Sequence, residues 1–96
     1  MPNSKHLKQL FVLVPQHIPS GPVKGAMAIC NFLCDHLPVT FVSAKTPVDP
    51  SSGLRKEVKT ASLAEAGGFL SRARLYREML RKAGPPGSVV SLSMCF

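Results

Sequence analysis

Two short apolar runs on either side of an amphipathic segment constrain the fold more than any other feature of this sequence. Residues 10–14 read LFVLV and are closed by Pro15, and residues 39–44 read VTFVSA. Unbroken, β-branched runs of this length are typical of strands buried on both faces of a parallel sheet. Because the segment between them has helical spacing, the pattern predicts a strand–helix–strand unit with a right-handed crossover.

The helix of this unit is expected from about Pro22 to Leu37. Ser20 or Gly21 can cap its start, and Pro22 suits the first helical position because the N–H that it lacks has no helical partner there. Pro38 disfavours helical geometry at the residue before it and therefore marks the end. The residues of the apolar stripe, which are expected to face the sheet, are Val23, Ala26, Met27, Cys30, Leu33, Cys34 and Leu37.

The second half of the chain predicts one more helix and two more strands. A surface loop rich in Pro, Ser and Gly precedes a short strand around residues 58–61, and Gly84 with two following prolines ends a helix over residues 69–83. The last run, residues 89–96, predicts a buried strand. The apolar stripe of this second helix consists of Phe69, Leu70, Ala73, Tyr76, Met79, Leu80 and Ala83.

These elements predict an α/β fold: a Rossmann-like three-layer α/β/α domain with a mostly parallel sheet. The 96 residues are enough for one small domain, so residues 1–96 are expected to form a single unit. Because the sequence stops inside its last apolar run, we expect the domain to be truncated at its C-terminal side. We also expect the last strand to leave an exposed apolar edge.

The cysteines and the apolar runs bound the compartment. Cys30, Cys34 and Cys95 are an odd count with neither a C-x-x-C pair nor a histidine at zinc-ligand spacing, so no disulfide scaffold and no metal site is predicted. Cys30 and Cys34 share one helix face, where small buried thiols are expected. No run is long enough for a signal peptide or a membrane span, and we expect a cytoplasmic chain.

The best candidate for a ligand site is the turn between the first strand and the first helix. Ser20, Gly21, Lys24 and Gly25 lie at the carboxyl end of a strand and at a helix N-terminus, where backbone N–H groups and a partial positive charge favour phosphate. The spacing Gly21-x-x-x-Gly25 matches neither G-x-G-x-x-G nor G-x-x-x-x-G-K-[ST]. The alternative is a capped helix start in which Gly25 permits close helix–strand packing.

Acid–base chemistry has little basis in the sequence. His17 lies in the candidate loop, either with a functional role or as a solvated loop residue, and the five acidic residues form no pair at a motif spacing. No residue is therefore assigned as catalytic, and no cofactor is predicted.

The charge favours an anionic partner. Twelve Lys and Arg against five Asp and Glu leave a net charge of +7. Arg74, Arg77 and Arg81 share one face of the second helix, which predicts either contact with an anionic membrane surface or a solvated face. Aromatic residues are sparse and no nucleic-acid-binding motif is present, so nucleic acid is not an expected partner.

Four segments of the chain resemble a known family, the retaining glycosyltransferases of the GT-B architecture, in the large family-four group that uses nucleotide-sugar donors. The segments are FVLVPQHIPSGPVKGAMAICNFL, PVTFVSAK, VKTASLAEAGGFLSRARLYREMLRKAG and SVVSLSMCF. The order of these elements matches the N-terminal Rossmann-like domain of that family. The family's loop typically has two adjacent glycines and an acidic residue, whereas Pro22 and Lys24 stand at the corresponding places here.

The resemblance implies that the chain is the N-terminal part of an enzyme that transfers a hexose from a nucleotide-sugar to a hydroxyl acceptor. The family's paired glutamates and nucleotide-binding residues lie in a second, donor-binding domain that these 96 residues do not include. The chain alone is then expected to be inactive, with His17 and the segment from Ser20 to Gly25 facing the cleft between the domains. The alternative is a small non-enzymatic α/β module that binds phosphate or anionic surfaces.

Overall fold

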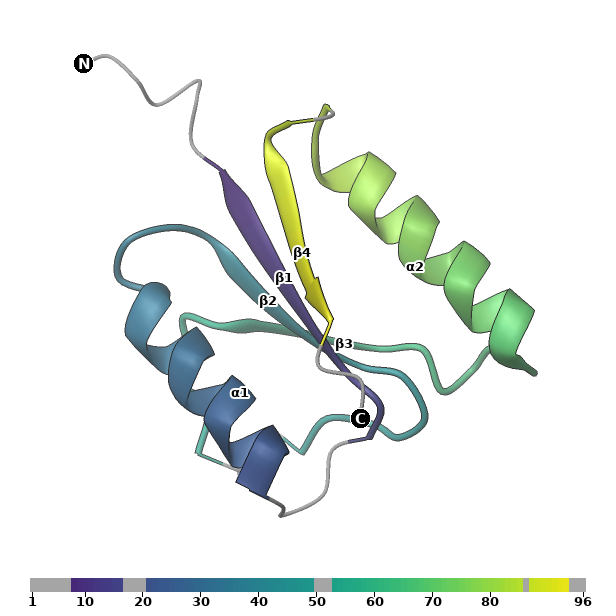
Figure 1. The fold of residues 1–96 in the computed structure, drawn as a ribbon, viewed down its shortest axis with the longest axis horizontal. Coiled ribbons are helices and arrows are strands. Elements are labelled where there is room, and N and C mark those ends of the chain that lie inside the picture. Colours follow the sequence, from purple (N-terminus) through teal and green to yellow (C-terminus); the bar gives the residue numbers. More distant parts are fainter. Residues whose placement is uncertain (1–7, 17–20, 50–52, 86, 94–96) are drawn as a thin grey trace.

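Four parallel strands form one sheet in the order β3-β2-β1-β4 (Figure 1). The computed structural model describes residues 8–16, 21–49, 53–85 and 87–93. The elements follow one another as β1 (Gln9–Val14), α1 (Gly21–Leu33), β2 (Val39–Ser43), β3 (Lys59–Ser62), α2 (Phe69–Ala83) and β4 (Val89–Ser93). Val12 lies opposite Phe41 of β2 and opposite Leu92 of β4, so β1 occupies the interior of the sheet.

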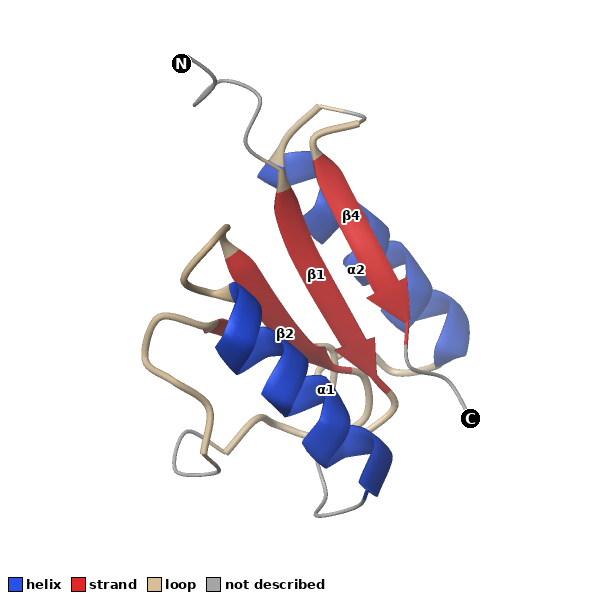
Figure 2. Ribbon diagram, turned by 60° about the vertical axis from the view of Figure 1, so that its left-hand side comes forward, coloured by secondary structure: helices blue, strands red, loops and turns tan. Residues whose placement is uncertain are grey.

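The two helices cover opposite faces of the sheet (Figure 2). On one face Val23, Ala26 and Cys30 of α1 pack against alternate residues of β1 and β2, and on the other face Tyr76 and Leu80 of α2 contact a smaller cluster. The chain therefore has the predicted fold class, a small Rossmann-like α/β/α domain with a parallel sheet.

The direction of the chain through the sheet reverses at β1. The crossover through α1 leads from β1 to its neighbour β2, whereas the crossover through α2 leads from β3 back past both strands to β4, on the other side of β1. In open α/β sheets, ligands bind at the carboxyl ends of the strands beside such a reversal. The boundary between β1 and β4 is that place here.

The connection between β2 and β3 contains no described helix and is fixed to α1 instead. Val48 and Leu54 of this connection pack on the α1-side core, and the backbone N–H of Arg55 donates to Asn31 Oδ1 at 2.8 Å. Arg55 also pairs with Asp35 at 2.7 Å. The α1 face is thereby closed by one helix and one loop.

Three expectations from the sequence need correction. The first helix ends at Leu33 and continues as a turn to His36, whose N–H donates to Leu33 O at 2.8 Å, because the backbone tightens before Pro38. β4 was expected to be buried, but it lies at the sheet edge with its side chains largely exposed. The expected exposed apolar edge is confirmed, since Val90 and Leu92 are 44% and 38% exposed.

The third correction concerns the stripe of the second helix. Its C-terminal members Tyr76, Met79, Leu80 and Ala83 pack on the sheet as expected. Phe69 and Leu70 do not, since they are 75% and 74% exposed. Both lie at the start of α2, before Tyr76, which is the first residue of this helix that packs on the buried cluster of the sheet.

Candidate functional site

The carboxyl ends of the strands meet at one edge of the sheet, and backbone hydrogen bonds hold the segments that leave them. Ala44 N–H donates to Val14 O at 2.9 Å, and Lys45 N–H donates to Pro15 O at 3.0 Å. Leu63 N–H donates to Ser43 O at 2.9 Å. The pairing of β1, β2 and β3 therefore extends past the regular strands and fixes Lys45 beside Pro15.

The candidate phosphate loop is described only from Gly21 onward. Gly21 is the first residue of α1, and Gly21, Lys24 and Gly25 are all exposed. A Cβ atom added at Gly21 or Gly25 would meet nothing within 4 Å. The alternative of a small Gly25 for close helix–strand packing is therefore wrong, because no strand in the described part of the chain approaches that position. The predictions for His17 and Ser20 lie outside the described residues.

A cavity of about 500 Å³ opens between α2 and the carboxyl edge of the sheet. Its walls come from the ends of all four strands or the residues that follow them, and from the first two turns of α2. The lining residues are Leu13, Pro15, Ala44, Lys45, Leu63, Phe69, Arg72, Ala73, Tyr76 and Ser93. Cavities of this size accept a small molecule.

Two cations line this otherwise apolar cavity. Lys45 follows the carboxyl end of β2, and the half-buried Arg72 lies in the first turns of α2. Within the described ranges, no carboxylate lies at ion-pair distance from either side chain. Neither residue was among those predicted from the sequence to bind a ligand. The signal for Lys45 was available, since it directly follows a predicted strand at the ligand-binding edge.

Tyr76 forms the inner wall of the cavity and joins α2 to two strands. Its hydroxyl shares a hydrogen bond of 2.6 Å with the Ser91 hydroxyl on β4, and its ring contacts Phe11 of β1 edge to face at a centroid distance of 6.4 Å. Burial raises the pKa of Tyr76 above its usual value, although the Ser91 hydrogen bond acts in the opposite direction. The phenol is therefore neutral near pH 7 and serves as a hydrogen-bonding wall.

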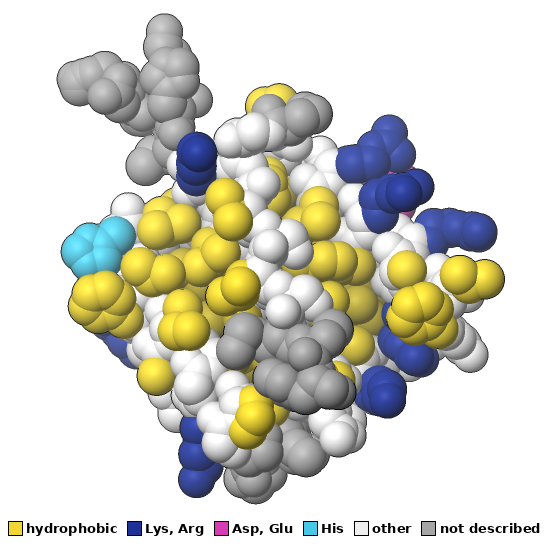
Figure 3. All heavy atoms as spheres, viewed as in Figure 1, with side chains coloured by type: hydrophobic (Ala, Val, Ile, Leu, Met, Phe, Trp, Pro, Cys, Tyr) yellow, Lys and Arg dark blue, Asp and Glu magenta, His cyan; other side chains and the backbone are white. Residues whose placement is uncertain are grey.

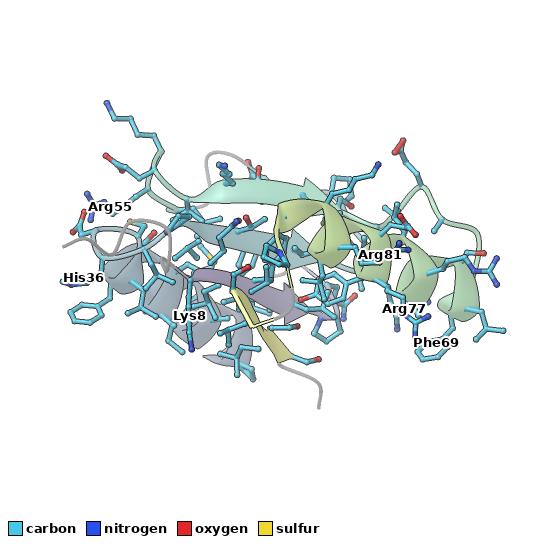
Figure 4. All side chains as sticks on the ribbon, turned by 90° about the horizontal axis from the view of Figure 1, so that it is seen from above. Lys8, His36, Arg55, Phe69, Arg77 and Arg81 are labelled. Carbon is cyan, nitrogen blue, oxygen red and sulfur yellow. The ribbon has the colours of Figure 1, made fainter. Side chains whose placement is uncertain are left out.

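The basic residues predicted on the second helix lie on an exposed surface. Arg74, Arg77 and Arg81 are exposed, and Arg81 pairs with Glu78 at 3.0 Å. Figure 4 shows Arg77 and Arg81 on α2 with Phe69 at the same end of the molecule, away from His36 and Arg55. In Figure 3, apolar side chains gather over α2 on the right with Lys and Arg around them. This surface combines cations with exposed apolar groups.

The cysteines behave as buried or half-buried thiols. Cys30 is fully buried, and this burial, with a smaller effect of nearby Cys34, raises its pKa to about 12. Cys34 is half-buried and its thiol donates to Asn31 O at 3.2 Å. The expectation of small packed thiols is confirmed for Cys30, whereas Cys95 lies outside the described residues. Within the described part of the chain, no three metal-ligating side chains come together.

Among the described residues, no helix has the length and apolar character needed to cross a membrane. Comparison of the chain with protein-family models, with curated proteins and with solved structures finds no match.

Proposed function

We propose that this chain is the acceptor-side, Rossmann-like half of a cytoplasmic retaining glycosyltransferase that transfers a hexose from a nucleotide-sugar to a hydroxyl acceptor. The observation that carries the proposal is the reversal of strand order at β1. The carboxyl end of β1 lies at this reversal and at the same edge of the sheet as the cavity, and this edge is where α/β sheets bind ligands. The sequence resemblance supplies the reaction class.

The proposal divides the work between two domains. Gly21, Lys24 and Gly25 are exposed at the start of α1, where they can approach the donor diphosphate from one side of a cleft. The donor-binding residues and paired glutamates belong to the second domain in this proposal. The purified 96-residue chain is accordingly expected to transfer no sugar from any common nucleotide-sugar.

The transcript that encodes the chain provides the most direct test. A reading frame that continues beyond the codon for Phe96 into a second Rossmann-like domain with paired glutamates would support the proposal. A transcript that contains no such domain would overturn the proposal. Sugar transfer that copurifies with the 96-residue chain would also overturn the proposal that the reaction needs a second domain.

The diphosphate contact can be tested separately in the two-domain protein. The Cβ atom that Gly21→Val adds meets nothing within 4 Å, so α1 is expected to keep its helical content. If the backbone at Gly21 contacts the diphosphate, the bulky side chain blocks this approach and weakens nucleotide binding. The matched control is Gly67→Val, whose added Cβ also meets nothing within 4 Å. Equal binding by both variants would remove Gly21 from the site.

A second candidate function follows from α2, described along its whole length, which buries none of its residues. A helix with exposed Phe69 and Leu70 beside exposed arginines has the character of an interfacial helix on anionic lipid. We propose that α2 holds the protein at an anionic membrane surface. This function is open to a non-enzymatic binding module as well as to a transferase.

Sedimentation with vesicles tests the membrane proposal. The full chain is expected to bind vesicles of phosphatidylserine and phosphatidylcholine, and not vesicles of phosphatidylcholine alone. The double variant Phe69→Ser, Leu70→Ser is expected to lose binding. Phe32→Ser is the matched control, because Phe32 is 69% exposed but lies on α1. Equal loss in both variants would contradict a specific role for α2.

A further inference from the structure

We propose that the cavity between α2 and the sheet binds an organic phosphate monoester whose non-phosphate part is apolar. The cavity lies on the α2 face, whereas the proposed diphosphate contact lies at the start of α1. The inference therefore goes beyond the proposed glycosyltransferase and does not depend on it.

The size and lining of the cavity define the apolar part of the ligand. About 500 Å³ is within the range of sites for small molecules. Leu13, Leu63 and Ala44 form the sheet side of the lining, and Phe69 and Ala73 form part of the helix side. A ring or short alkyl chain that enters this space removes its own surface and that of the walls from water, which is favourable.

The charge of the lining defines the other part of the ligand. Arg72 comes from the helix wall and Lys45 from the sheet wall, and none of the lining residues among the described ranges is acidic. Two cations match the two negative charges of a phosphate monoester, whereas a carboxylate would neutralise only one. The first turn of α2 also carries no acidic residue, and its partial positive charge adds to the attraction.

The structure also argues against a free nucleotide as the occupant. The base and ribose of a nucleotide need several hydrogen-bond partners, but the uncharged lining is dominated by hydrocarbon. The Tyr76 hydroxyl already shares a hydrogen bond with Ser91. Polar groups buried without partners lose free energy, so an apolar body is favoured over a nucleoside.

Tyr76 provides a readout inside the cavity. It is the only tyrosine of the chain, and there is no tryptophan, so the intrinsic fluorescence of the protein reports on this wall. The probes are n-hexyl phosphate, hexan-1-ol and inorganic phosphate, none of which absorbs at the excitation wavelength of tyrosine. Titration calorimetry of the same probes measures affinity independently of fluorescence.

We expect n-hexyl phosphate to change the Tyr76 fluorescence saturably and to bind at least tenfold more tightly than either hexan-1-ol or inorganic phosphate. Comparable binding of hexan-1-ol would show an apolar pocket with no role for the cations. Comparable binding of inorganic phosphate would show a general anion site with no role for the cavity walls. Either result would overturn the proposal.

Paired variants separate the cavity from the general positive charge of the protein. Arg72→Met keeps the aliphatic stem of Arg72 and is expected to weaken n-hexyl phosphate binding about tenfold, the scale of one charge-assisted hydrogen bond. Arg74→Met removes the same charge from an exposed position of α2 that does not line the cavity, and is expected to leave binding within twofold of the parent. Equal losses in both would overturn the assignment of the headgroup to Arg72.

A third variant keeps the test decisive if Arg72→Met alters folding. Ala73→Leu enlarges a side chain in the cavity wall and leaves both cations in place. It is expected to weaken n-hexyl phosphate binding while circular dichroism shows an unchanged helical content. Full binding by a folded Ala73→Leu variant would place the ligand elsewhere and overturn the proposal.

Discussion

The two helices of this protein pack on the same sheet in different ways. α1 buries Val23, Ala26 and Cys30, and a loop that is hydrogen-bonded to Asn31 closes the same face. α2 is two residues longer but buries none, and a cavity remains beneath its first turns. The α1 layer therefore holds the fold together, whereas the packing of the α2 layer leaves room for a ligand.

The strands explain this difference. Leu10, Val12 and Val14 of β1 face α1 together with Phe41 of β2, which provides a continuous apolar surface. On the other face, β4 places Ser91 opposite Phe11 and Ser93 opposite Leu13. On this face α2 packs on the apolar cluster from Tyr76 onward, while its first two turns border the cavity.

The largest effect is expected from truncating the α1-side core. Phe41 is fully buried, and Phe41→Ala is expected to lower the free energy of unfolding by about 3–5 kcal/mol, because both burial and packing are lost. Met79 of α2 is half-buried against the other face of the sheet, and Met79→Ala is expected to lower the free energy of unfolding by less than half as much. Urea denaturation followed by circular dichroism measures both values. Similar losses would show that the two layers support the fold equally.

The next effect is the pH dependence that Cys30 contributes to the α1 layer. Burial raises the pKa of Cys30 to about 12, above the ordinary value of 9.0, so between these values the unfolded chain loses a proton that the folded chain keeps. Stability is therefore expected to fall as pH rises from 9 to 12, by up to ~1.4 kcal/mol per pH unit. Below pH 9 the thiol is protonated in both states, so it does not change the free energy of unfolding with pH.

The variant Cys30→Ala isolates this contribution from other groups that titrate in the same range, including Tyr76, whose pKa burial also raises. Denaturant midpoints of the parent and variant are compared at several pH values from 7 to 11.5. The parent should lose more stability than the variant above pH 9. Parallel curves would mean that the folded state tolerates the Cys30 thiolate.

Much of this arrangement could be predicted from the sequence, and the exceptions have physical causes. The α1 stripe around Val23, Ala26 and Cys30 was correct because helical spacing and flanking prolines determine which side faces a sheet. The exposure of Phe69 and Leu70 could not be predicted, because the stripe gives the direction of a side chain and not how closely the helix packs on the sheet at that point.

The candidate site shows the same division. The sequence predicted which edge of the sheet gathers the carboxyl ends of the parallel strands, where such sheets bind ligands. It did not identify the cavity, because Lys45 and Arg72 are 27 positions apart and line the same space only when α2 packs over the sheet. The sequence correctly predicted the exposed β4 edge, but the prediction that the β4 side chains are buried was wrong.

A smaller effect is expected at that edge, in the self-association of the chain. Val90 and Leu92 are exposed on an edge strand, and Figure 3 shows apolar side chains across the face where α1 and β4 lie. Unpaired strand edges with apolar side chains favour pairing with another chain. We expect concentration-dependent oligomers in sedimentation velocity, and we expect Leu92→Lys to shift the protein toward monomer.

Leu70→Lys is the control for this prediction, since Leu70 is the more exposed residue but lies on α2. If association follows the strand edge, Leu70→Lys leaves the oligomers unchanged. A monomeric Leu70→Lys variant beside an associating Leu92→Lys variant would reverse the assignment. It would make α2, and not β4, the adhesive surface of the molecule.

The smallest effect is expected at the ion pair that fastens the β2–β3 connection to α1. The hydrogen bond from Arg55 holds the pKa of Asp35 below its ordinary value of 3.8, so the pair stabilises the fold above that pH and is lost as pH falls through the lower, folded-state value. Both side chains are exposed, and exposed pairs contribute little because water and salt screen them. Asp35→Asn should therefore lower the unfolding midpoint slightly at pH 7 and low salt, and the difference from the parent should shrink at high salt and again below pH 3.8.

Glu65→Gln is the control, because Glu65 is exposed and makes no ion pair with the described residues. If Asp35→Asn lowered the stability as much as Phe41→Ala does, the ion pair between Arg55 and Asp35, and not the apolar core, would hold the α1 layer in place.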